Sequence, residues 1–500
     1  MLNSVDFSGR PFHFIGIGGI GMSALAYVLA KRKLSVSGSD LRLTHITQRL
    51  QAEGVHVFWQ QDGSNLNFST SKQPDPTSAQ TSDDASNAAH GAVRELPQVI
   101  CSTAINLSNA EYRAAKTLGC PIFHRSDLLA ALMADYKGIA VAGTHGKTTT
   151  SSLIGYLLMR ANLDPTIVIG GEVAAWQGNA RLGQGDYLVA EADESDGSLA
   201  KLSAQFGIIT NIELDHPDHY STLDEVVDIF KAFQRQCKIT IGSIDCATVR
   251  QVIKPDISYS LNLESAADYI ATDLKPDPIG TMVTVWEQGK RLGELRLPML
   301  GQHNVSNALA AIAVGRQLDL PFAQIADILK DFQGARRRFE HRGFHQGILF
   351  VDDYGHHPSE VRATLSAARL KAHQSADNFS ERRVVAIFQP HRYSRAAALL
   401  SDFADAFGDA DQVIVTDIYA AGEQNTHNIT GSAVAQAIAH KHTQTQFCAS
   451  LDDVKTALRH ILRPGDIAIF LSAGNLNQVI PDVMAFYQQV DAAELETVHS

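Results

Sequence analysis

The chain has 500 residues, of which 45% are hydrophobic and 19% charged, and its formal net charge is −12. This length and composition predict about three globular domains. The negative charge argues against a nucleic-acid surface, and no apolar run approaches the ~18 residues that a membrane span needs. Because MLNSVDFSGR, the first ten residues, lacks a basic segment followed by an apolar one, we expect a cytoplasmic protein without a membrane partner.

The beginning of the chain predicts a Rossmann-like unit. FHFIGIGGIGMSALAYVLAKRKLSVSGSD indicates an apolar strand, a glycine turn, an amphipathic helix and a second strand that ends in Asp40. Gly16, Gly18 and Gly21 satisfy the GxGxxG pattern of a diphosphate-binding turn, and Asp40 lies near where an acidic residue would meet a ribose hydroxyl. The pattern does not tell which nucleotide binds, so NAD binding and a mere tight turn stay open as alternatives.

Residues 61–95 are rich in Ser, Thr, Asp, Asn and Pro and contain scarcely an apolar side chain. A segment of this composition buries too little surface to become ordered by itself. We therefore expect a disordered insertion at about 61–95, inside a first domain that spans residues 1–135.

The clearest motif of the chain is IAVAGTHGKTTTS, in which an apolar strand runs into a glycine turn, a lysine and several hydroxyls. Backbone N–H groups around Gly143 and Gly146 would surround phosphate oxygens, Lys147 would meet the β- and γ-phosphates, and the Thr148 hydroxyl suits Mg²⁺. The motif is a short form, because Val141 occupies the position of the first glycine in GxxxxGK[ST]. It predicts a triphosphate-binding loop; the alternative is a glycine-rich turn that happens to contain a lysine.

Two acidic segments follow this loop in a central domain predicted over residues 136–334. The strand in YLVAEADES is apolar until it ends in Glu191, Asp193 and Glu194, where Mg²⁺ is commonly held, although a plain polar strand end is the alternative. ITNIELDHPDHY gathers carboxylates and imidazoles, as metal or phosphate sites and some surface loops do. These side chains are Glu213, Asp215, His216, Asp218 and His219. Asn304 opens an Ala-rich helix, either as a ligand of a base or phosphate or as a plain N-cap.

A third α/β domain is predicted over residues 335–500. The strand in GILFVDDYGHHP ends in Asp352, Asp353 and Tyr354, and FQPHRYSR places three basic side chains just past the next strand. These three are His391, Arg392 and Arg395. Because the carboxyl ends of strands form the ligand crevice of an open α/β sheet, we expect these residues to converge with His356. Together they predict a second anion or carboxylate site, although each histidine alone is equally well explained as a helix cap.

These motifs resemble those of the Mur ligases of peptidoglycan synthesis, over nearly the whole chain. FIGIGGIGMSALA, GTHGKTTT, EADESDGS, GQHNVSNALAA, RRRFE, DDYGHHP, FQPHRYSR and DIYAAGE occur in that family's order. The resemblance implies three α/β domains: a Rossmann-like domain for a UDP sugar, a P-loop ATPase-type central domain for ATP and Mg²⁺, and a Rossmann-like C-terminal domain for an amino acid. DDYGHHP and FQPHRYSR favour the branch that joins L-alanine to the lactyl carboxylate of UDP-N-acetylmuramate.

The motifs and the resemblance together assign residues to each ligand. The UDP sugar is expected at Gly16, Gly18, Gly19, Gly21, Met22 and Asp40. ATP is expected at Gly143, Thr144, His145, Gly146, Lys147, Thr148, Thr149 and Asn304. The metal is expected at Thr148, Glu191 and His216, and the amino acid at Tyr354, His356, Arg392 and Arg395. The residues expected to be catalytic are Lys147, His216, His356, Arg392 and Arg395.

Two features depart from the family's pattern. The insertion at about 61–95 is longer than the family usually carries there. Several relatives bridge two Mg²⁺ ions with a carbamylated lysine, but here helical register places Phe230 at that position, as expected for the alanine-adding branch. We therefore do not expect Lys231 to be a metal ligand.

The chemistry agrees with the resemblance. A carboxylate is a poor electrophile, so ATP must convert it to an acyl phosphate before an amine attacks, and phosphoryl transfer depends on positioning and charge neutralisation. His356 or Asp353 is a candidate base for the amine. Arg392 and Arg395 would bind either the alanine carboxylate or the transferring phosphoryl group.

Three other readings of the chain stay open. A relative could add a preformed peptide or another amino acid to the same sugar. A P-loop switch or motor would hydrolyse ATP alone, but it leaves the His/Arg group of the third domain without a role. A nicotinamide dehydrogenase would use the first glycine turn, but it leaves GTHGKT unexplained. The sequence is compatible with a monomer or a homodimer.

Overall fold

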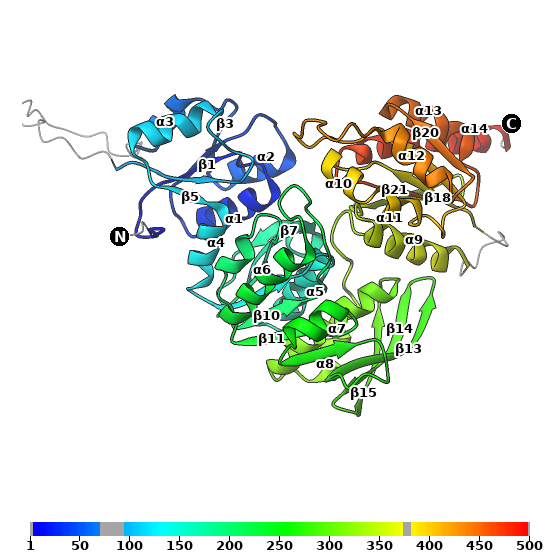
Figure 1. Cartoon of the computed structure of the whole chain (residues 1–500), viewed down its shortest axis with the longest axis horizontal. Helices are drawn as coiled ribbons and strands as arrows, with labels where there is room; N and C mark the ends of the chain where they lie inside the picture. Colours follow the sequence, from blue (N-terminus) through cyan, green and yellow to red (C-terminus); the bar gives the residue numbers. More distant parts are fainter. Residues whose placement is uncertain (1–3, 71–94, 374–381, 499–500) are drawn as a thin grey trace, which may run out of the picture. The chain divides into compact units, whose positions relative to one another are not determined.

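The computed structural model describes residues 4–70, 95–373 and 382–498. Its strands form three sheets, which confirms the predicted α/β class with three sheet-containing domains (Figure 1). By internal contacts the chain divides into two compact units: residues 1–140, 163–191 and 198–205, and residues 141–162, 192–197 and 206–500. Among the described residues, no helix combines the length and the apolar character that a membrane span needs.

The first sheet has five parallel strands in the order β3-β2-β1-β4-β5. Its strands are β1 (Phe12–Ile15), β2 (Val36–Ser39), β3 (His56–Phe58), β4 (Gln98–Cys101) and β5 (Ile122–His124). Its helices are α1 (Ile20–Lys31), α2 (His45–Ala52), η1 (Gly63–Thr70), α3 (Ala110–Leu118) and α4 (Arg125–Met133). The strand order reverses at β1, and in such sheets the ligand crevice lies at this switch point, outside the carboxyl ends of the strands. The glycine turn directly follows β1 and therefore lies at that crevice.

The predicted disordered insertion begins too early at residue 61. Residues 63–70 form the 3-10 helix η1, in which Leu66 is 2% exposed and packs with Val99 and Ala115. The Asn65 amide donates hydrogen bonds to Gln60 O at 2.7 Å and Glu111 Oε1 at 2.8 Å. One apolar side chain and one buried amide are enough to anchor this turn, which the composition of the segment concealed. The remaining part of the predicted insertion, residues 71–94, lies outside the described residues.

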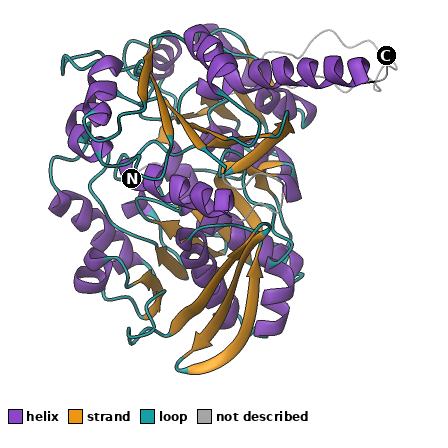
Figure 2. Cartoon of the chain, turned by 90° about the vertical axis from the view of Figure 1, so that its right-hand side faces the viewer, coloured by secondary structure: helices purple, strands orange, loops and turns teal. Residues whose placement is uncertain are grey.

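The second sheet has ten strands in the order β15-β14-β13-β12-β11-β10-β6-β9-β7-β8. They are β6 (Lys137–Ala142), β7 (Thr166–Val173), β8 (Gly178–Arg181), β9 (Tyr187–Glu191), β10 (Phe206–Ile209), β11 (Ile239–Ser243), β12 (Ile257–Ser260), β13 (Tyr269–Asp277), β14 (Gly280–Glu287) and β15 (Lys290–Leu297). The helices are α5 (Lys147–Arg160), η2 (Ala174–Trp176), η3 (Ser198–Lys201), α6 (Leu223–Gln236), η4 (Val249–Ile253), α7 (Gln302–Gln317) and α8 (Phe322–Leu329). Strands β13, β14 and β15 extend the sheet as antiparallel hairpins, which are the long strands at the bottom of Figure 2.

The third sheet has the order β16-β17-β21-β18-β19-β20, parallel except for β16. Its strands are β16 (Glu340–His345), β17 (Ile348–Asp353), β18 (Val384–Phe388), β19 (Gln412–Thr416), β20 (Thr445–Cys448) and β21 (Ile467–Leu471). Its helices are α9 (Pro358–His373), α10 (Tyr393–Ala398), α11 (Leu400–Ala404), α12 (Gly431–Ala439), α13 (Leu451–Ile461), η5 (Leu476–Gln478) and α14 (Val479–Val498). Neighbours along β17 belong to different cores, Val351 to one cluster and Phe350 to the other. The sheet is therefore buried on both faces, as near-continuous apolar strands predict.

Candidate functional site

The phosphate loop joins β6 to α5 and has the predicted strand–loop–helix form. Gly143 and Gly146 have φ values of 142° and 82°, where only glycine is unstrained, and a Cβ on Gly143 would lie 1.9 Å from Thr210 Oγ1. Lys147 Nζ donates to Gly143 O at 2.6 Å and to both carboxylate oxygens of Glu194 at 2.8 Å. The lysine is thus held across the mouth of the loop, where a phosphate would meet it.

Glu194 is the carboxylate that the structure places beside the candidate catalytic groups. It is 2% exposed, and His216 Nε2 lies 4.0 Å from its Oε1. Burial raises the pKa of Glu194 to about 7, against the opposing effect of the Lys147 ammonium. Sequence reasoning preferred Glu191, which ends β9 in the first unit and accepts a hydrogen bond from the Gly170 amide at 2.7 Å. EADES contains Glu194 as well as Glu191, but the alternation of side chains between the two faces of a strand stops where the strand ends. It therefore could not predict which way Glu194 points.

The oxygens of Thr148 and Glu194 are the kind of donor that Mg²⁺ prefers, so this part of the loop fits a magnesium ion. Thr148 is 5% exposed, and its Oγ1 accepts a hydrogen bond from Arg338 at 3.3 Å. Lys231 pairs with Asp228 at 3.5 Å, and Phe230 is fully buried in α6; that Lys231 is not a metal ligand stays a prediction.

A cavity of about 230 Å³ adjoins the phosphate loop. Its lining includes the predicted nucleotide residues His145, Gly146, Thr149 and Asn304, together with Met299, His303, Asn307, Arg338 and Phe339. Asn304 does not cap α7, because Gly301 is the N-cap and the Asn304 amide donates to Leu300 O at 2.7 Å. Burial lowers the pKa of His303 to about 4, so this ring is neutral near pH 7. Apolar, amide and neutral imidazole groups of this kind suit a nucleotide base.

The His/Arg group of the third sheet converges as predicted. The His356 ring lies 5.7 Å from the His391 ring and 5.5 Å from the Tyr354 ring, and Arg395 Nη1 lies 3.3 Å from His391 Nδ1. Burial lowers the pKa of His356 to about 4. His356 is therefore neutral near pH 7 and has a lone pair that can accept a proton.

Both arginines already hold carboxylates of the DHPDHY segment, which sequence reasoning missed. Arg395 is 2% exposed and donates through Nε to Asp215 Oδ1 at 2.8 Å, while Arg392 pairs with Asp218. Thr144 adds a backbone link, since its Oγ1 accepts from the Glu213 amide at 2.9 Å. Nothing local in the sequence signals pairs that are 180 and 174 residues apart.

Two non-glycine residues, one in the DHPDHY segment and one in the His/Arg group, have left-handed backbone conformations. His216 has a φ of 56° and Arg392 a φ of 69°. Such conformations cost of order 1–3 kcal/mol and persist where surrounding structure enforces them, often at functional sites.

Asp353, the other candidate base, is a structural acceptor: its oxygens accept hydrogen bonds from the amides of Phe339 and Gly355, both at 2.8 Å.

In the first unit, the glycine turn is closed by Asp40. The Gly18 amide donates to Asp40 Oδ2 at 2.8 Å, and a Cβ on Gly18 would lie 2.7 Å from the same oxygen. Gly16 has a φ of 79°, and Gly19 is the N-cap of α1. The other predicted members follow within α1: a Cβ on Gly21 would lie 3.5 Å from Arg125 Nη1, which is an ordinary contact distance, and Met22 is 3% exposed. Asp40 therefore shapes the turn, and its contact with a ribose stays a prediction.

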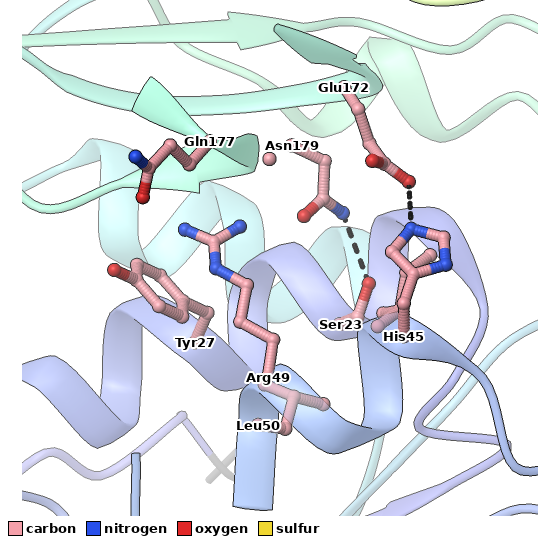
Figure 3. A pocket seen from close by; sticks show the side chains of 10 residues that line it. Ser23, Tyr27, His45, Arg49, Leu50, Glu172, Gln177 and Asn179 are labelled. Carbon is pink, nitrogen blue, oxygen red and sulfur yellow. Dashed lines mark hydrogen bonds and ion pairs between the residues drawn. The ribbon is translucent and has the colours of Figure 1, made fainter. Parts of the chain in front are cut away.

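A small cavity of about 30 Å³ lies in the first unit, between helices α1 and α2 and the β7–β8 hairpin (Figure 3). Asn179 donates to Ser23 Oγ at 3.0 Å, and His45 Nε2 pairs with Glu172 Oε1 at 2.6 Å. The Arg49 guanidinium stacks on the Tyr27 ring, 4.1 Å from its centroid. Asn179 thus ties the hairpin to α1, which follows the glycine turn, His45 ties it to α2, and Arg49 joins α2 to α1. No motif in the sequence marked them.

Three family models match in succession: "Mur ligase family, catalytic domain" over residues 11–137, "Mur ligase middle domain" over 141–315, and "Mur ligase, glutamate ligase domain" over 337–474. A UDP-N-acetylmuramate–L-alanine ligase of Nostoc punctiforme is 60% identical over 97% of this chain and 98% of its own length. One from Trichormus variabilis is 58% identical with the same coverage.

Among solved structures, UDP-N-acetylmuramate-alanine ligase MurC of Thermotoga maritima matches with a TM-score of 0.78 at 26% identity, over 96% of this chain and 99% of its own. A murein peptide ligase of Psychrobacter arcticus has a TM-score of 0.69 at 21% identity, over the same shares, and supports the fold alone.

Proposed function

The chain belongs to the Mur ligase family, and on that premise we propose that it joins L-alanine to the carboxylate of UDP-N-acetylmuramate with consumption of ATP. The supporting relatives are named for this reaction and match almost end to end. The observation that carries the proposal is the arrangement of the second unit. There the phosphate loop and the His/Arg group meet through the segment that contains Asp215 and His216.

The reaction has two steps. A carboxylate oxygen of the sugar attacks the γ-phosphorus of ATP, which forms an acyl phosphate and releases ADP. The amine of L-alanine then attacks the carbonyl carbon, inorganic phosphate leaves, and the amine proton passes to a base. The first step requires neutralised charge and fixed geometry more than covalent help from the protein.

The loop residues serve the first step. Lys147, now paired with Glu194, would exchange this partner for phosphate oxygens and offset their developing charge. Thr148, Glu194 and His216 would hold Mg²⁺, which neutralises phosphate charge when bound. Residues around the 230 Å³ cavity, with Asn304 and Thr149 among them, would receive the adenine end of ATP.

The His/Arg group serves the second step. His356 is neutral near pH 7, and because burial holds its pKa at about 4 it would relay the amine proton to the leaving phosphate or to water rather than retain it. Arg392 is 31% exposed at its side chain and can turn toward the alanine carboxylate, and Tyr354, whose ring lies 5.5 Å from that of His356, would line the same pocket. Arg395 is fully engaged with Asp215 and would hold the pocket in shape. The UDP end is proposed to bind at the glycine turn of the first unit.

The test is ADP release with UDP-N-acetylmuramate, ATP and Mg²⁺, with and without L-alanine, with the product mass measured. We expect release that depends on both substrates and a product that carries one alanine residue. Glycine, L-serine and a preformed peptide serve as competing amines, and preference for one of them would redirect the assignment. Steady ATP hydrolysis without the sugar would instead indicate a nucleotide switch.

The metal assignment has a matched pair of variants. Glu194→Gln should raise the Mg²⁺ concentration needed for half-maximal ADP release, because it removes a charged ligand. Glu191→Gln should not, if Glu194 is the ligand. The reverse result would restore Glu191 as the ligand, and the same titration with Mn²⁺ measures the metal preference. We further propose a cytoplasmic location, where ATP and UDP sugars occur together; sedimentation distinguishes monomer from homodimer.

A further inference from the structure

Four side chains from three segments close a ring beside the phosphate loop. His145, within the loop, has Nδ1 3.3 Å from Glu360 Oε1 and Nε2 3.3 Å from Glu213 Oε2. Ser359 Oγ donates to the same Glu213 oxygen at 2.8 Å, and Ser359 and Glu360 are neighbours in the first turn of α9. The ring therefore runs from the phosphate loop to the third sheet's first helix and back.

The second oxygen of Glu360 holds the peptide that carries the candidate base. Glu360 Oε2 accepts the amide of His356 at 3.0 Å and the amide of His357 at 3.3 Å, and His356 Nδ1 lies 3.3 Å away. One carboxylate thus contacts the nucleotide-binding loop through one oxygen and the amine-transfer site through the other.

The cycle formed by His145, Glu213, Ser359 and Glu360 contains charged side chains. Burial alone would lower the pKa of His145, but Glu213 and Glu360 raise it to about 10, so the ring nitrogens are both protonated near pH 7. Burial would raise the pKa of Glu360, but the charged His145 and Arg338 beside it hold it well below its usual range. Charge-assisted contacts of this kind are stronger than neutral ones and fix geometry.

A metal ion is the alternative occupant, because ligand atoms of His145, Glu213 and His357 lie within 4.8 Å of one another. Two observations disfavour it. Both nitrogens of His145 already face carboxylates, and His357 Nδ1 accepts the Ser359 amide at 3.3 Å, which leaves the proton on Nε2. The two N–H groups of the protonated His145 satisfy both carboxylates without a metal.

We propose that Glu360 is a positioning residue that couples the phosphate loop, through His145, to the peptide holding His356. The inference rests on the proposed function and deepens it. Formation of the acyl phosphate needs the loop, whereas transfer to the amine needs His356 in place, so loss of Glu360's charge weakens the second step selectively.

Glu360→Gln is the main variant. Its amide oxygen can still accept the two backbone N–H groups, but without the charged contact to His145 the side chain is no longer fixed in the position that holds the His356 peptide. We expect the rate of amide formation to fall about ten- to a hundredfold, the effect of one charge-assisted contact. Positional isotope exchange in ATP, measured with UDP-N-acetylmuramate and no L-alanine, should stay within about threefold of wild type. Glu287→Gln is the control, since it removes the same charge from the Arg316 pair between β14 and α7 and should change neither rate.

His145→Asn, and the double variant that combines it with Glu360→Gln, test whether the phosphate loop and the His356 peptide are coupled. If the ring acts as a unit, the double variant forms amide no more slowly than the slower single variant. Ser359→Ala, which removes only a hydroxyl, provides a milder break should another variant fold poorly, and should show the same selective loss on a smaller scale.

Equal losses of isotope exchange and amide formation in Glu360→Gln would overturn the proposal, and so would no loss in either or additive effects in the double variant. Failure of the proposed function is distinguishable, because wild type itself would then show no sugar-dependent exchange.

Discussion

Arg395 and Arg392 lie three residues apart in FQPHRYSR, yet the structure predicts a large loss of stability when Arg395 is removed and a small one when Arg392 is removed. The Arg395 and Asp215 side chains are 2% and 5% exposed and joined by a 2.8 Å contact. Arg395→Ala leaves the Asp215 carboxylate buried without its partner, and breaking a buried pair in this way costs about 3–5 kcal/mol. Arg392 pairs with Asp218 and Glu423 at the surface, with side chains 19–35% exposed, where such pairs contribute about 0–1 kcal/mol.

The assay is thermal unfolding by calorimetry at pH 7.5. For a domain of 150–250 residues, 1 kcal/mol shifts Tm by about 2–4 °C, so the transition of the third domain should fall by about 6–20 °C in Arg395→Ala and by at most about 4 °C in Arg392→Ala. The double variant Arg395→Met with Asp215→Asn should recover much of the loss, because it leaves no buried charge behind. Equal shifts for the two single variants, or a double variant worse than both, would refute the reasoning.

Three further changes have defined outcomes. Lys147→Ala should lower turnover about 10²–10³-fold, by analogy with loss of one preorganised charge, while calorimetric UDP-sugar affinity stays unchanged; more than a tenth of wild-type turnover would contradict this. The folded-state pKa of His145, about 10, exceeds its unfolded value of about 6.5, so its stabilisation is complete below pH 6.5 and disappears as pH rises through 10. The Tm difference between wild type and His145→Asn should therefore shrink from pH 6.5 to 10, and a growing difference would be inconsistent with the ion pairs. Deleting residues 72–92, which are polar in sequence, should leave turnover and Tm nearly unchanged, and lost UDP-sugar affinity would show that the segment contributes to the first site.

The sequence predicted those helices, strands and turns that are determined by neighbouring residues. Gly143 and Gly146 stand where the chain needs φ values that other residues avoid, and apolar runs before them mark buried parallel strands. Glu360 also had a local signal, because HHPSE places a glutamate at the third position of a helix, where it accepts the N-cap amide of His357.

Contacts between side chains that are far apart in the sequence could not be predicted from such local patterns. Arg395 reads as a free cation until folding places Asp215 against it, and a basic side chain that already has a buried partner differs chemically from one awaiting a ligand. Leu66 shows the same limit from the other side: a single apolar residue in a polar stretch finds a core contributed by β4 and α3. Local composition has no access to that core.

The order of strands in the third sheet has a consequence for synthesis on the ribosome. Strand β21, the last to be made, lies between β17 and β18, so those two strands have open edges until residues 467–471 emerge. At about 5–20 residues per second this exposure lasts many seconds, during which unpaired apolar strands can aggregate. A nascent chain, or one that terminates before residue 467, therefore has a complete phosphate loop but a third sheet that lacks the strand joining β17 to β18.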